Sequence, residues 1–200
     1  MNKTSFKPAV IPLMAVSAGV IVANIYYNQP ILQAIALSLK VTETQIGKIS
    51  MLSQLGYGLG MFFLLPLGDK VNRKNLILLL CALLVLTLFF ITLTSSLTAL
   101  YILSFFVGLF STPAQIILPM AATLGKENRG KNVGVVFSGI LVGILGARVI
   151  SGFITELLGW RYVFGISGVM VLAVTLMLKL YLPEVPSKFK GSYFNLIKST

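Results

Sequence analysis

The sequence predicts an all-α membrane protein with six transmembrane helices. Of its 200 residues, 56% are hydrophobic and only 10% are charged, whereas a soluble domain carries about 25% charged residues. The mean hydropathy is +0.94. The apolar residues form long runs, and no run alternates with period two over the length of a membrane β-strand. A soluble fold of this size could not bury so much apolar surface, so the surrounding solvent is predicted to be lipid.

The apolar runs define the expected helices. A spanning helix needs about 20 mostly apolar residues. Six stretches qualify, covering approximately residues 9–36, 45–67, 75–94, 97–124, 133–155 and 160–182. The first is longer than a bilayer requires and is expected to bend near Pro30. Residues 9–182 are therefore predicted to form one six-helix bundle.

The two ends of the chain are predicted to be cytoplasmic tails. Residues 1–8 carry two lysines before an apolar run, as a signal peptide does. That run is long for a signal peptide and lacks a small-residue cleavage site, so it is predicted to remain as the first helix. Residues 183–200 turn polar, with prolines and lysines, and are similar to a cytoplasmic linker.

The basic residues predict the orientation. Cytoplasmic loops carry an excess of lysine and arginine, and with the N-terminus inside, the outer loops hold only Lys40, Lys48 and Arg161. Most of the 16 basic residues then fall on the cytoplasmic side, which places both termini there. The net charge of +11 has the same explanation, so no nucleic-acid partner is predicted.

The inventory of reactive residues excludes several kinds of site. The chain has no histidine and one cysteine, Cys81, so it can form no internal disulfide, no zinc site and no Cys/His nucleophile pair. No enzyme activity and no cofactor are predicted. All five acidic residues lie at helix ends or in loops, whereas a proton relay normally needs a carboxylate or histidine within the membrane. Proton coupling would need an acid from a second half, from another subunit, or from Asp69 or Glu156 at the rim.

An internal similarity predicts a repeat. The segment from Asp69 to Lys74 follows the second run, and the segment from Glu156 to Arg161 follows the fifth. Both have an acid, two residues, a turn-forming residue, one residue and a base. Because three helices is an odd number, the second copy would be upside down relative to the first. The bundle is therefore predicted to be an inverted 3+3 repeat, as in many transporter halves.

Residues 65–77 resemble a family signature. The loop between helices 2 and 3 of the major facilitator superfamily reads G-x-L-A-D-R-x-G-R-K-x-x-L. The matching positions are Leu67, Asp69, Arg73, Lys74 and Ile77, with Lys70 as a basic substitute. The departures are Leu65, Gly68 and Asn72. Asn72 replaces the glycine of the turn and also tolerates a left-handed conformation.

The fifth run resembles the antiporter signature of this family, G-x8-G-x3-G-P-x2-G-G. Its counterparts here are Gly134, Gly143, Ala147, Arg148, Ser151 and Gly152. Small residues are kept, but an arginine replaces the proline. The fourth helix lacks the family's usual arginine and has Ser104 instead. The segments Tyr27–Ile31 and Gly159–Arg161 are similar to bacterial members of the drug-efflux type.

The resemblance covers residues 9 to 200 but only half of a family member, which has twelve helices in two halves. It implies the N-terminal half of a secondary transporter of efflux type in a bacterial plasma (inner) membrane. The implied partners are the bilayer, an unidentified small molecule, and a second copy or a second half-transporter. The alternative is a truncated, non-transporting membrane protein that inserts but needs a second half or partner.

Five polar residues are predicted to line a substrate cavity, namely Arg148, Asn24, Tyr27, Asn28 and Gln115. A charge inside a membrane helix is costly and usually faces the bundle interior or a water-filled cavity. Two alternatives stay open. Arg148 could pair with backbone carbonyls or extend to the interface, and Tyr27 could belong to the interfacial aromatic belt.

Two further roles come from the resemblance. Asp69, Arg73, Glu127 and Arg129 are expected to form a cytoplasmic latch between conformations, the alternative being solvated charges that fix orientation. The small residues Gly134, Gly143, Ala147, Ser151 and Gly152 are expected to form a helix-packing motif.

Overall fold

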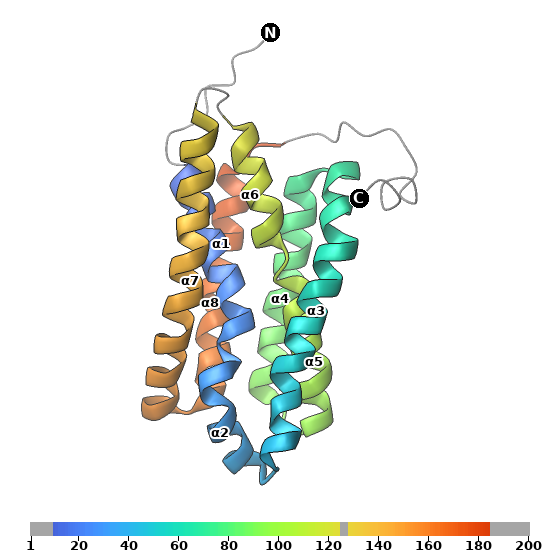
Figure 1. Ribbon diagram of the computed structural model, residues 1–200, viewed down its shortest axis with the longest axis vertical. Coiled ribbons are helices and arrows are strands. Elements are labelled where there is room, and N and C mark those ends of the chain that lie inside the picture. The colour runs from blue at the N-terminus through green and yellow to red at the C-terminus, as the bar shows by residue number, and fades with distance from the viewer. Residues whose placement is uncertain (1–9, 125–127, 185–200) are drawn as a thin grey trace.

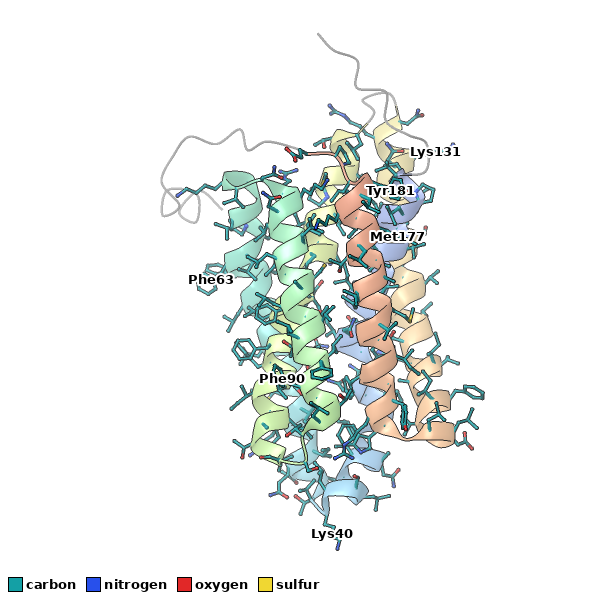
Figure 2. The ribbon with its side chains drawn as sticks, turned by 180° about the vertical axis from the view of Figure 1, so that it is seen from behind. Lys40, Phe63, Phe90, Lys131, Met177 and Tyr181 are labelled. Carbon is teal, nitrogen blue, oxygen red and sulfur yellow. The ribbon has the colours of Figure 1, made fainter. Side chains whose placement is uncertain are left out.

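The computed structural model describes residues 10–124 and 128–184, which form a bundle of long helices without any strand (Figure 1). The helices are α1 (Val10–Tyr26), α2 (Asn28–Leu39), α3 (Glu43–Lys70), α4 (Arg73–Leu93), α5 (Leu97–Phe110), α6 (Pro113–Thr123), α7 (Arg129–Leu158) and α8 (Trp160–Tyr181). Large apolar side chains such as Phe63 and Phe90 point outward (Figure 2). The predicted all-α membrane class is confirmed.

The helices account for up to six membrane spans. Five segments are long and apolar enough by themselves, and α5 with α6 counts as one of them. The sixth is the bent pair α1 and α2. Relative to the expected ranges, α3 and α7 each extend a few residues further at both ends. The tail at residues 1–8 and nearly all of the tail at 183–200 lie outside the described residues.

Two spans are interrupted, and a proline follows each break. The axis bends by 41° between α1 and α2, so the bend expected near Pro30 lies at Tyr27. Pro30 has no amide hydrogen to offer the preceding turn. Between α5 and α6 the break at Ser111 and Thr112 precedes Pro113. Pro113 has no amide hydrogen to donate to the carbonyl of Leu109. That carbonyl instead accepts a hydrogen bond from the hydroxyl of Thr112 at 3.0 Å.

The spans pack in a regular set of pairs. The most extensive contacts join α1 to α7, α3 to α5, and α4 to α8. Exchanging the first three spans with the last three converts the first of these pairs into the second and leaves the third unchanged. An inverted 3+3 repeat requires such a pattern, and the repeat itself stays a prediction.

Glycines allow the closest of these contacts. A Cβ atom on Gly56 of α3 would lie within 3 Å of the backbone of Phe105 in α5. A Cβ atom on Gly108 of α5 would likewise collide with the backbone of Ser53 in α3. The two backbones therefore touch, as small residues permit between membrane helices.

The contact between α1 and α7 is built in the same way. Gly19 of α1 lies against the backbone of Gly139 and Gly143 of α7, with no room for a Cβ atom. Within the predicted packing motif, Gly143 makes this contact, and Ala147 and Ser151 are buried. The motif's other members, Gly134 and Gly152, are different, because a Cβ atom there would meet nothing within 4 Å.

The two ends of the bundle differ in charge. The α3–α4 turn, the start of α7 and the end of α8 lie at one end (Figure 1). That end carries Asp69, Lys70, Arg73, Lys74, Arg129, Lys131 and Lys179. Lys40 lies at the opposite end, far from Lys131 (Figure 2).

Candidate functional site

The charged turn between α3 and α4 is held by local hydrogen bonds. Arg73 at the start of α4 forms an ion pair with Asp69 at the end of α3, and its Nε donates to the carbonyl of Gly68 at 3.2 Å. Asn72 caps α4 by accepting a hydrogen bond from the backbone NH of Lys74 at 3.0 Å. Its φ of −60° is not left-handed. The asparagine therefore replaces the signature glycine as a helix cap, and the left-handed conformation that it tolerates is not used.

The residues of the expected latch are only partly brought together. Asp69 and Arg73 pair within their own turn, and the Asp69 side chain is 52% exposed. Arg129 is exposed at the start of α7. Glu127 lies outside the described residues. The Asp69–Arg73 ion pair thus connects the two ends of the α3–α4 turn. A role as a latch between conformations stays a prediction.

Asn24 is buried and joins α1 to α8. Its Nδ2 donates to the carbonyls of Val20 and Ile21 at 3.0 and 3.2 Å. Its Oδ1 accepts a hydrogen bond from the hydroxyl of Ser167 at 2.7 Å. Only 1% of Asn24 is exposed, so its hydrogen-bonding groups are used inside the bundle.

Asn28 plays the equivalent part between α2 and α3. It donates to the hydroxyl of Ser53 at 3.0 Å and accepts from the hydroxyl of Ser50 at 3.3 Å. Tyr27, which precedes it, is buried as well and lies near Ser167. Asn24, Tyr27 and Asn28 therefore face neighbouring helices of this bundle rather than an open surface.

The other two predicted cavity residues belong to a different group, which we call the polar row: Arg148, Tyr26, Tyr57 and Gln115. The guanidinium carbon of Arg148 lies 5.8 Å from the centre of the Tyr26 ring. Tyr57 lies near Tyr26. The amide of Gln115 donates to the hydroxyl of Tyr57 at 2.7 Å. Arg148 is exposed and the other three are partly buried.

The polar row collects side chains from four spans. Arg148 comes from α7, Tyr26 from the end of α1, Tyr57 from the middle of α3, and Gln115 from the first turn of α6. Arg148 lies ten residues before the end of α7, which is about 15 Å at 1.5 Å per residue. The 30 residues of α7 span about 45 Å, so with α7 centred in a hydrocarbon core about 30 Å thick Arg148 lies about 7 Å inside that core.

No acid compensates Arg148 within the described residues. Glu43 and Asp69 lie at the two ends of α3, Glu156 lies in the last turn of α7, and Glu184 follows α8. None of them forms an ion pair with Arg148. The middle of the described bundle is thus positively charged and free of carboxylates.

Sequence reasoning did not single out Tyr57. A tyrosine in an apolar run is equally typical of a membrane interface and of a cavity wall. The sequence feature that could have indicated Tyr57 is the pair of glycines, Gly56 and Gly58, that flank it near the centre of a span. Tyr26 stood beside the predicted Tyr27; at the break between α1 and α2, Tyr27 is buried and Tyr26 is only partly buried.

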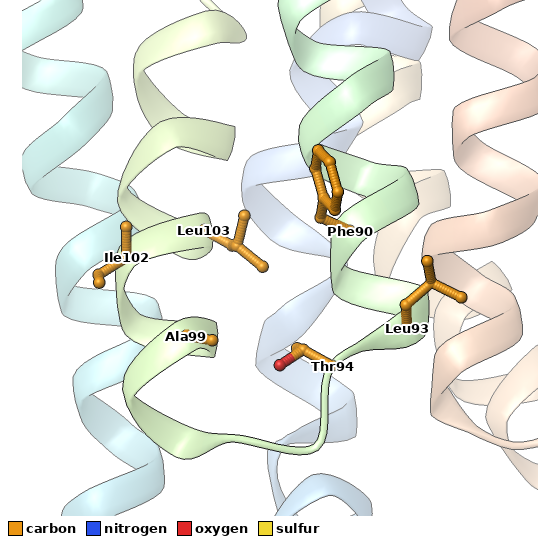
Figure 3. A pocket seen from close by; sticks show the side chains of 6 residues that line it. All are labelled: Phe90, Leu93, Thr94, Ala99, Ile102 and Leu103. Atoms are coloured by element: carbon orange, nitrogen blue, oxygen red, sulfur yellow. The ribbon is translucent and has the colours of Figure 1, made fainter.

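Two hollows in the described part of the bundle are apolar and lie away from the polar row. A groove of about 360 Å³ runs between α4 and α5 and is lined by Phe90, Leu93, Thr94, Ala99, Ile102 and Leu103 (Figure 3). A smaller hollow of about 130 Å³ lies between α4 and α8. Neither is lined by the polar row. Over residues 10–124 and 128–184, no three metal-ligating side chains come together.

Comparison with known proteins identifies the family. The model of the Major Facilitator Superfamily matches residues 14–195. The chain belongs to this superfamily. It is 39% identical over 193 residues to the putative uncharacterized transporter YgaY of Escherichia coli K12, covering 96% of this chain and 49% of that protein. It is 29% identical over 185 residues to the probable transporter SCO4007 of Streptomyces coelicolor, covering 92% of this chain and 43% of the relative.

A solved structure shows the same fold. The POT family transporter PepTSo superposes with a TM-score of 0.73 at 20% identity, covering 92% of this chain and 40% of its own. The chain spans about half the length of the curated relatives it matches. As a member of this transporter superfamily it is a multi-pass membrane protein and not an enzyme, as its sequence predicted.

Proposed function

We propose that this chain acts as the N-terminal six-helix half of a secondary transporter that exports a small molecule. Membership of the superfamily and relatives named as transporters support transport. The export direction rests on the similarity of its motifs to those of efflux-type members.

The polar row is the observation that carries this proposal. Four spans contribute one polar or charged side chain each to it, and Arg148 at its edge is exposed. A charge that faced lipid at this depth would cost a few kcal/mol or more. The exposed side of the row is therefore proposed to border water and solute in the working transporter.

A second six-helix unit is proposed to complete that cavity. The spans α3 and α7 bury the smallest share of their apolar stretches. Their exposed faces carry Gly58, Gly134 and Gly152, around which there is open space. Small residues on an exposed face let a further helix approach closely, so these faces suit a second half or a second copy of the chain.

The proposed setting is a bacterial-type inner membrane with both termini in the cytoplasm. The lysine- and arginine-rich end of the bundle is assigned to the cytoplasmic side. No cofactor is invoked. If protons drive transport, the carboxylate within the membrane must come from outside the described spans, or Asp69 or Glu156 must serve from the rim.

Flux and assembly together test the proposal. Inverted membrane vesicles containing the chain should accumulate a fluorescent solute when energised, and the chain should run in native detergent micelles as an assembly of two six-helix units. The solute panel should include an anion such as carboxyfluorescein and a cation such as ethidium. A strictly monomeric chain without flux for any solute would support the alternative, a membrane protein that inserts but does not transport.

A further inference from the structure

We propose that the polar row binds an organic anion, namely a carboxylate-bearing molecule with an aromatic or other flat apolar body. This inference rests on the proposed function, because it assigns a substrate class to the same face. It is argued from three properties of the row: its charge, its balance of hydrogen-bond donors and acceptors, and its rings.

The charge of the row is positive and uncompensated. An arginine side chain is a cation with donors only, and Arg148 forms no ion pair within the described residues. Its guanidinium carbon lies 5.8 Å from the centre of the Tyr26 ring. The face of an aromatic ring attracts a guanidinium but gives the guanidinium N–H groups no hydrogen-bond acceptor. A carboxylate can accept two of these N–H groups in parallel.

The hydrogen-bonding groups of the row also favour an acceptor-rich ligand. Gln115 donates to the oxygen of Tyr57, so the hydroxyl hydrogen of Tyr57 is directed elsewhere and can donate. Arg148 offers donors only, and Tyr26 adds a hydroxyl. The carbonyl oxygen of Gln115 is an acceptor in the row, but a cationic solute would be repelled by Arg148.

The rings of Tyr26 and Tyr57 favour a solute with a flat apolar part. Tyr26 ends α1 at the break, Tyr57 lies in α3, and the two side chains lie near each other. Aromatic rings stack or meet edge to face with other rings. The buried polar pairs do not compete for the solute, because Asn24 and Asn28 already have partners within the bundle.

A protein carboxylate could neutralise Arg148 instead, if a second six-helix unit supplied one. That arrangement would make Arg148 an assembly residue rather than a ligand-binding residue. The experiment therefore measures ligand binding and self-association on the same samples.

The test uses the full chain in nanodiscs of zwitterionic phosphatidylcholine, with empty nanodiscs as the background. The probes are naphthoate, naphthylmethylamine and naphthalenemethanol, which share one ring system and are negative, positive and neutral. Binding is followed by their fluorescence anisotropy. Saturable binding is expected for naphthoate, weaker binding for the alcohol, and none for the amine.

Matched variants assign the site. Arg148→Gln should weaken naphthoate binding about 10-fold to 100-fold, because it removes a charged hydrogen-bonding partner. Arg148→Lys should lose less, since a point charge remains. Tyr57→Phe should weaken binding about 2-fold to 10-fold, the effect of one neutral hydrogen bond. Lys179→Gln, at an exposed position near the end of α8, should bind as the wild type does.

Four results would overturn the assignment: no saturable naphthoate binding, equal binding of the amine, wild-type affinity in Arg148→Gln, or a loss of self-association in that variant without a loss of anion affinity. Binding is measured without flux, so the two proposals fail separately. A chain that binds naphthoate and carries no solute refutes transport but keeps the anion site. A chain that transports the cationic solute and ignores naphthoate keeps transport and refutes the anion site.

Discussion

Two groups of polar side chains lie within the membrane-spanning part of this protein, and they differ in what they contact. The first consists of the buried pairs Asn24 with Ser167 and Asn28 with Ser53, each of which joins two helices. The second is the polar row, in which Arg148 is exposed. All the groups of the first have partners inside the bundle, while the second retains donors without acceptors.

The difference separates residues that hold the bundle together from residues that are available to a solute. Both groups are equally unusual in an apolar sequence, so composition alone cannot distinguish them. The contacts of each side chain distinguish the two groups. Asn24 points toward α8 and is satisfied there, whereas Arg148 lies against the Tyr26 ring and is exposed on this six-helix unit.

The largest expected effect is on transport and comes from the polar row. Arg148→Ala should abolish solute flux while the protein still inserts and folds, since its guanidinium makes no ion pair or hydrogen bond within the described bundle. Flux into vesicles and the melting temperature of the purified protein should be measured together, with Lys179→Gln as the control. Wild-type flux in Arg148→Ala would remove Arg148 from the cavity.

A second contrast lies between a packed and an open glycine. Gly108→Leu should destabilise the bundle by about 3 kcal/mol or more, because its side chain would overlap the backbone of α3. Gly58→Leu has open space around it and should cost little within the six-helix unit. Unfolding in SDS titrations compares the two. Equal losses of stability would contradict the α3–α5 contact.

The buried pairs should affect stability rather than binding. Asn24→Leu removes the partner of Ser167 and should lower the free energy of unfolding by about 0.6–1.7 kcal/mol, the range found for hydrogen bonds between membrane helices. Anion affinity measured on the folded fraction should stay unchanged. A lost affinity with normal stability would move Asn24 from the first group to the second.

The smallest expected effect comes from one hydroxyl. Tyr57→Phe keeps the ring and removes the group that accepts from Gln115. Flux should fall about 2-fold to 10-fold, with the unfolding free energy changed by about 0.5–1.5 kcal/mol at most. A complete loss of flux would mean that Tyr57 does more than donate one hydrogen bond.

The spans were predictable because lipid imposes a simple rule on length and polarity, and the runs in this chain obey it. Arg148 and Gln115 stood out for the same reason, as polar groups within apolar runs. The destinations of Asn24 and Asn28 were not predictable. Their partners are Ser167 of α8 and Ser53 of α3, which lie 143 and 25 residues away in the sequence, so the pairing depends on how the helices pack.

The turn at Asn72 shows a limit of a different kind. A family signature gives the position of a turn, but the backbone angle follows from the residue present. Here asparagine caps α4 through its side chain, so the same turn is made without a left-handed residue.

The central claim is that the polar row borders water, while the buried pairs do not. Labelling by a membrane-impermeant thiol reagent tests it in Tyr57→Cys and Asn24→Cys, both made in a Cys81→Ala background because Cys81 is the only native thiol. We expect rapid labelling of the cysteine at position 57, slowed by naphthoate, and none of the cysteine at position 24 in the folded protein. Equal labelling of both positions, or no labelling at position 57, would contradict it.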